Sequence, residues 1–234
     1  EDKGKRCDLL LALGDALDEG GQPRRVLDRE LPEAFSLAEA LGDKRRAARA
    51  CFLATLALAI EGANLPQVWM SPEAAEWAGR ADRYAETGTV ERVRADLTLG
   101  LVRYYSGERH QGIALFSRAL DLARELGDSE IFWFASYLWL FIAAVPRRAE
   151  ELLHLAEKLV ASSRAGVRPV TLGAGLWNAG CVFFDWGQRQ PAEKAWHELQ
   201  ELTERSGHVY VMLVSAMLDG LLATISGRLE DGEQ

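Results

Sequence analysis

Residues 100–127 read GLVRYYSGERHQGIALFSRALDLARELG, and their arrangement recurs along the chain. Gly107 separates two helical patterns, and Gly127 ends the second of them 20 residues later. Turn signals recur at intervals of 39 to 45 residues through the 234 residues, at Gly21, Gly62, Gly107, Pro146, Gly187 and Gly227. A period of this length is typical of a repeat protein, and each period has room for two helices.

A glycine also recurs seven residues before four of these turns, at Gly14, Gly100, Gly180 and Gly220. Because glycine has no side chain, its recurrence at one place on the first helix indicates that a neighbour packs closely against the backbone there. The first helices are expected at 6–20, 44–61, 90–106, 129–145, 170–186 and 209–226. The second helices are expected at 23–41, 72–87, 108–126, 147–165 and 190–206.

The second helices are amphipathic. In 108–126 the apolar residues recur every three or four positions, as expected for one buried helix face: Ile113, Phe116, Ala119, Leu120, Ala123 and Leu126. The sequence therefore predicts an all-α chain of about eleven helices in antiparallel pairs. It would form a single array with units at 6–42, 43–88, 89–127, 128–166, 167–207 and 208–234, the last truncated.

Net charge, hydropathy and cysteine spacing argue against several classes of function. The net charge of −8 argues against direct nucleic-acid binding. The most apolar run, Ile131–Val145, has 15 residues, whereas a membrane span needs about 20, so no membrane partner is expected. Cys7, Cys51 and Cys181 are widely spaced and odd in number, which favours reduced, buried thiols in a cytoplasmic protein.

No catalytic motif is present. The chain lacks GxxxxGK[ST], HExxH, GxSxG and a GxGxxG after a strand, which hold phosphate, zinc or acyl groups in many enzymes. We therefore expect no catalytic residues, no metal and no cofactor. The chain opens on EDKGKR without an initiator Met and stops just past Gly227, where a further second helix would be due. These ends predict a fragment of a longer protein.

The third unit resembles the tetratricopeptide repeat through Gly100, Gly107, Gly112, Phe116 and Ala119. The fifth unit matches through Gly180, Gly187, Ala192 and Trp196, with Leu199 replacing the last small residue. Units two and four depart from the pattern, because Thr55 and Trp139 take the first small position. The resemblance implies a right-handed alpha-alpha superhelix, and a period near 40 is similar to the longer-helix variety in large bacterial regulators.

Cys7 to Leu58 is similar to the stretch that follows the ATPase module in bacterial multidomain signalling regulators. Those proteins join an NTPase and a tetratricopeptide array to a LuxR-type DNA-binding domain or a class III nucleotide cyclase domain. The resemblance implies a sensor or scaffold module that binds a peptide, a protein segment or a small effector and has no chemistry of its own. The alternative is a structural spacer or oligomerisation arm without a ligand.

In the resembling family the first helices line a concave groove. Carrying that register over gives these candidate partner-binding residues: Arg49, Phe52, Arg94, Leu97, Leu101, Tyr104, Trp133, Ser136, Leu140, Trp177, Cys181 and Phe184. The groove would be aromatic with arginines at one side, which favours a guest with apolar anchors and a carboxylate.

Two helices leave alternatives open. Helix 129–145 is apolar all round, so its rings could face a groove, be pure core, or mediate self-association. Helix 209–226 presents many apolar residues without a partner helix, so it is expected to be loose or to pair with a second copy as a homodimer.

Overall fold

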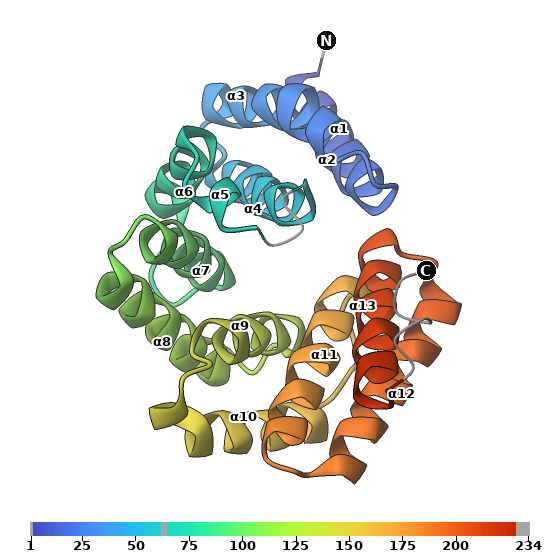
Figure 1. The fold of residues 1–234 in the computed structure, drawn as a ribbon. Coiled ribbons are helices and arrows are strands. Elements are labelled where there is room, and N and C mark those ends of the chain that lie inside the picture. Colours follow the sequence, from blue (N-terminus) through green and yellow to red (C-terminus); the bar gives the residue numbers. More distant parts are fainter. Residues whose placement is uncertain (1, 62–64, 228–234) are drawn as a thin grey trace. The chain divides into compact units, whose positions relative to one another are not determined.

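The computed structural model describes residues 2–61 and 65–227, apart from the side chains of Asp18 and Glu19. Over these residues the chain is all-α, with no strand. The first helices of the repeats are α1 (Lys3–Glu19), α4 (Lys44–Glu61), α7 (Val90–Tyr105), α9 (Ser129–Ile142), α11 (Pro169–Asp185) and α13 (Val209–Ile225) (Figure 1).

The second helices are α3 (Leu31–Leu41), α6 (Pro72–Tyr84), α8 (Arg109–Leu126), α10 (Ala149–Ala161) and α12 (Arg189–Ser206). The helix that ends in α3 begins as α2 (Pro23–Arg25) and passes through a π-helical segment, Val26–Glu30. A short helix, α5 (Pro66–Trp69), lies in the long connection of the second repeat. The predicted helices are thus confirmed, while the predicted turn at Gly62 lies outside the described residues.

The fourth repeat differs most from expectation, because α10 is shorter than the predicted 147–165. Pro146 starts a 3-10 turn, Pro146–Arg148, in which the helix has not yet reached α geometry. At the other end Ser162 has an extended backbone, and its hydroxyl donates to the carbonyl of Leu159 at 2.7 Å. That hydrogen bond satisfies a carbonyl at the helix end and stops the helix early.

The tripeptides Leu41-Gly42-Asp43 and Leu126-Gly127-Asp128 each end one helix and begin the next. Gly127 has a φ of 67°, the left-handed conformation that closes α8. The carboxylate of Asp128 then accepts a hydrogen bond from the backbone N–H of Ile131 at 2.9 Å, which caps α9. The same sequence therefore fixes both the length of a helix and the start of its successor.

The chain forms two compact units, residues 1–127 and 128–234, and the boundary coincides with a predicted repeat boundary. In the first unit α7 packs on α8, α4 on α6, and α1 on α3; in the second, α11 packs on α12, α9 and α10. Within each unit, neighbouring first helices thus contact one another, and each also packs on a second helix. The right-handed superhelix over all repeats remains a prediction.

Close packing at the recurring glycine is confirmed at Gly100 and Gly180, but not at Gly220, where no described atom lies within 4 Å of a built Cβ. A Cβ built on Gly100 would lie 3.2 Å from ring carbons of Phe116. The indole of Trp196 occupies the space that a Cβ on Gly180 would need. An aromatic ring of the second helix therefore packs directly on the backbone of the first helix, and this contact sets their separation.

In repeats two and four a larger residue, Thr55 or Trp139, takes the position of the recurring glycine. Thr55 is buried, and its hydroxyl lies 2.9 Å from that of Thr98. Trp139 is buried as well, and its indole N–H donates to Glu151 on α10 at 2.8 Å. Polar partners for both groups make these substitutions compatible with a packed interior. No helix in the described ranges combines the length and the apolar character that a membrane crossing needs.

Candidate functional site

The predicted groove residues of the first unit are mostly interior. Leu97, Leu101 and Phe52 are buried, so they support the fold and cannot offer their side chains to a partner. Arg94 lies over the Phe52 ring at 3.9 Å, a cation–π contact that covers this ring. Arg49 is more than half exposed and lies 3.6 Å from the carboxylate of Asp15.

Tyr104 is the partly exposed ring among the predicted residues of this unit. It stacks edge-to-face on Tyr105 at 5.3 Å and lies under the guanidinium of Arg109 at 5.6 Å. These neighbours hold the ring against α7 and α8. An aromatic groove flanked by two open arginines is therefore not what this unit presents.

In the second unit, the expectation that Trp133, Ser136 and Leu140 face a groove needs correction. All three are fully or almost fully buried. The Trp133 indole N–H donates to the carbonyl of Ser163 at 3.0 Å, so the ring has its polar partner inside the unit. Of the alternatives for helix 129–145, the core interpretation fits these three residues.

The predicted residues of α11 are more accessible. Trp177 and Cys181 are half-buried and Phe184 is exposed. The Phe184 ring lies 5.8 Å from that of Trp196. Burial, together with the Asp185 carboxylate, raises the pKa of the Cys181 thiol to about 12. This thiol stays protonated at neutral pH, which makes it a poor nucleophile.

A groove of about 540 Å³ lies in the second unit, where α9 and α11 end. We call it the α9–α11 groove; it is lined by Ala144, Val145, Pro146, Ala149, Leu152, Val182, Asp185 and Trp186. Large apolar side chains are unusually exposed at these helix ends: Phe141 (45%), Val145 (39%), Phe184 (38%) and Trp186 (41%). Exposed apolar surface of this kind is typical of protein-binding sites.

Two turn residues place the side chains of this groove. The ring of Pro146 sterically disfavours a helical conformation at the residue before it, so Val145 is extended, at φ −132° and ψ 144°. Gly187 has a φ of 68°, and this left-handed residue ends α11 directly after Trp186. The backbone N–H of Gln188 then donates to the carbonyl of Phe183 at 2.8 Å, which fixes the turn.

The family register missed Val145 and Trp186, because its inward positions stop before the last residue of each predicted first helix. The sequence does hold a signal for Trp186. A tryptophan immediately before a turn glycine lies at a helix end, where a repeat has little core to fill. Such a ring is therefore a candidate for exposure, and Trp are favoured anchors in protein interfaces.

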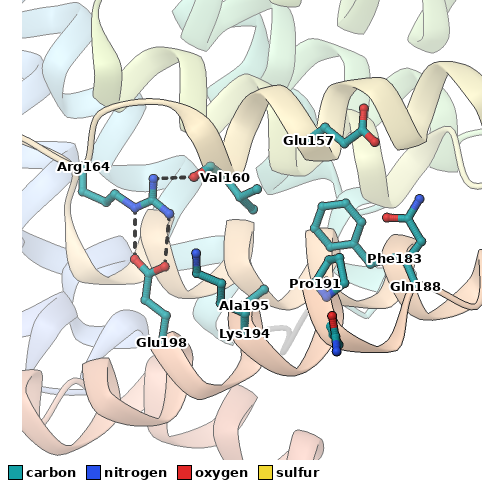
Figure 2. Close-up of a pocket in the computed structure, with 10 residues that line it drawn as sticks. Glu157, Val160, Arg164, Phe183, Gln188, Pro191, Lys194, Ala195 and Glu198 are labelled. Carbon is teal, nitrogen blue, oxygen red and sulfur yellow. Dashed lines mark hydrogen bonds and ion pairs between the residues drawn. The ribbon is translucent and has the colours of Figure 1, made fainter.

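A second cavity of about 500 Å³ lies between α10, α11 and α12 (Figure 2). Arg164 and Glu198 close one end with two hydrogen bonds of 3.0 and 3.1 Å. Phe183 and Pro191 lie toward the other end, and Lys194 rises from α12. Its lining is chemically mixed, because charged residues such as Arg164 and Lys194 lie beside apolar ones such as Phe183.

The Arg164 guanidinium has several further partners. It donates to the backbone carbonyls of Val160 and Ser162 at 2.6 Å each, and it lies 5.3 Å from the centre of the Trp133 ring. A guanidinium with so many protein partners joins α10 to α12 and covers a buried ring. We assign this ion pair a structural role.

No protein-family model matches the chain, and no curated protein is significantly similar to it. Among the residues that the structure describes, no three His, Cys, Asp or Glu side chains are grouped so that they could hold a metal ion.

Proposed function

We propose that this chain is a non-catalytic interaction module that binds a protein segment in the α9–α11 groove. The observation that carries the proposal is that two large exposed apolar side chains, Val145 and Trp186, line one groove. A volume of about 540 Å³ is large enough for a few side chains of a peptide. Trp186 would serve as the main anchor, because a rigid indole buries much area at low entropic cost.

The charge at the groove favours a basic partner. Asp185 is exposed and lines the groove beside Trp186. A carboxylate at the rim of an apolar site selects for Lys or Arg in the guest. This differs from the carboxylate expected from Arg49 and Arg94, because both arginines belong to the first unit and lie against neighbours there.

The wider role that we propose is that of a sensor or scaffold module in a cytoplasmic bacterial signalling regulator. Its support is the resemblance of the repeats and of Cys7 to Leu58 to the arrays of such proteins. Binding of a segment at the groove would then report to a domain elsewhere in the parent protein. If the chain is instead a structural spacer, the groove has no ligand.

A peptide selection tests the proposal. The full chain is immobilised and a phage-displayed random peptide library is selected against it, with counterselection on the Trp186→Ala variant. We expect enriched peptides with two apolar anchors and a Lys or Arg. Trp186→Ala should weaken them by about 2 kcal/mol, the scale of an interface hot spot.

The matched control is Met70→Ala, which removes another exposed apolar side chain in the first unit. This variant should bind the selected peptides like the wild type. Enrichment of no peptide, or of peptides that bind Trp186→Ala as well as the wild type, would reject the groove as a binding site. That result would favour the alternative that the chain is a structural spacer without a ligand.

A further inference from the structure

The cavity between α10, α11 and α12 has a charged end and an apolar end (Figure 2). Arg164, Lys194 and Glu198 line the charged end, and Phe183 and Pro191 lie toward the other. Its volume of about 500 Å³ is within the range of small-molecule sites. All the residues that line it belong to the second unit, so one compact unit builds the whole cavity.

Lys194 carries the uncompensated charge at the charged end. The three guanidinium nitrogens of Arg164 donate to protein oxygens, two to the Glu198 carboxylate and one to backbone carbonyls. Glu198 lies one turn from Lys194 on α12, but both of its oxygens accept from Arg164, which neutralises it. Lys194 has no hydrogen bond or ion pair with any residue that the structure describes. This end of the cavity therefore favours an anionic group.

The apolar end favours a hydrophobic body. Phe183 is buried in the unit and still lines the cavity, so its ring is a fixed apolar surface, and Val160 and Ala195 extend it. Glu157 on α10 carries the remaining charge of the lining, 3.4 Å from the His154 ring, and it lies on the side of Phe183 (Figure 2). A carboxylate there disfavours a second negative charge on the ligand.

We propose that this cavity binds a small organic monoanion, a carboxylate with an apolar body. Its anionic group would pair with Lys194, and its apolar body would lie on Phe183. The site is distinct from the α9–α11 groove, because no residue lines both. The inference therefore does not depend on the proposed function.

The probe is 8-anilinonaphthalene-1-sulfonate, a monoanion with two apolar ring systems whose fluorescence reports apolar binding. It is titrated with the full chain. We expect Lys194→Met to weaken binding about three- to tenfold, because a charge-assisted hydrogen bond is lost. Lys194→Arg keeps the charge and should retain most of the affinity. The matched control is Lys158→Met, which removes an exposed lysine of α10 that does not line the cavity.

A neutral probe separates the charge from the apolar contact. N-phenyl-1-naphthylamine has the same rings without the sulfonate, so Lys194→Met should bind it at least as well as the wild type does. Added salt should weaken binding of the sulfonate to the wild type more than to Lys194→Met.

Equal affinity of the wild type and Lys194→Met for the sulfonate would overturn the inference, because the probe would then occupy another apolar surface. No binding by the wild type, or an equal loss in Lys158→Met, would also reject the site. If Lys194→Met loses both probes alike, the lysine shapes the cavity and does not pair with an anion, and the proposal is wrong.

Discussion

Gly112 on α8 determines how closely α8 approaches α7. A Cβ at this position would lie 2.8 Å from the backbone oxygen of Gly100 and 2.8 Å from the Cβ of Tyr104. The first of these atoms belongs to a helix backbone, so relief requires the two helices to separate. A single methyl group at Gly112 is therefore expected to strain the whole helix pair.

Gly112→Ala should lower the free energy of unfolding by about 1–2 kcal/mol, because overpacking outweighs the better helix propensity of alanine. Gly79→Ala should instead raise it by about 0.5–1 kcal/mol, since Gly79 is helical and has open space around it. Urea denaturation of the two variants measures both values. Equal changes in the two variants would contradict this account of the α7–α8 contact.

Arg46 on α4 binds two carboxylates, that of Asp8 on α1 and that of Asp43 directly before α4. It donates to Asp8 at 2.8 Å from two nitrogen atoms, and these hydrogen bonds lower the pKa of Asp8. Its backbone N–H and then its guanidinium lower the pKa of Asp43. Both carboxyls therefore titrate below their ordinary pKa of about 4 in the folded protein.

A depressed folded pKa adds stability that is present above the ordinary carboxyl pKa and is lost as the pH falls through the folded value. The free energy of unfolding should therefore fall below about pH 4, and Arg46→Met should make that fall shallower. Arg45→Met is the control, because its side chain has no hydrogen bond to either carboxylate among those described. Urea denaturation at several pH values measures the slopes. Identical slopes in the wild type and Arg46→Met would refute the linkage.

At the scale of helices, α9 carries a buried tryptophan and α11 a partly accessible one. Trp133 on α9 is fully buried, and its ring occupies the space beside Gly175 of α11. Trp177 on α11 is half-buried. The two residues were predicted to line one groove, but they contribute differently to the packing of these helices.

Trp133→Ala should therefore cost about 3–5 kcal/mol of stability, as expected for a large core ring. Trp177→Ala should cost clearly less, because part of its ring already contacts water. Thermal melting followed by circular dichroism measures the difference. Similar melting temperatures for the two variants would show that the exposed and buried assignments are wrong.

Most helices could be predicted from the sequence, because glycine and aspartate at helix ends act locally. Gly127 and Asp128 fix a boundary whatever the rest of the chain does. The burial of Trp133 could not be predicted in this way, because it depends on Ser163, thirty residues away along the chain, and on the missing side chain of Gly175. The α9–α11 groove depends likewise on two turns that converge only in the folded unit.

At the scale of the whole molecule, the chain consists of two compact units, each with its own buried aromatic residues. The first unit buries Trp69, Trp77 and Phe116, and the second buries Trp133, Trp139 and Trp196. The α9–α11 groove and the cavity between α10, α11 and α12 both belong to the second unit. We therefore expect recognition to depend on this unit and the first unit to act in support of it.

The most direct test of the central claim is hydrogen exchange by the full chain with and without a peptide from the selection. The account predicts slower exchange at residues 141–149 and 182–188, which form the groove and its turns, and little change in residues 2–61. The residues of α9 and α11 outside the groove report whether the effect is local. Protection confined to the first unit, or absent throughout at saturating peptide, would contradict the assignment of the α9–α11 groove as the binding site.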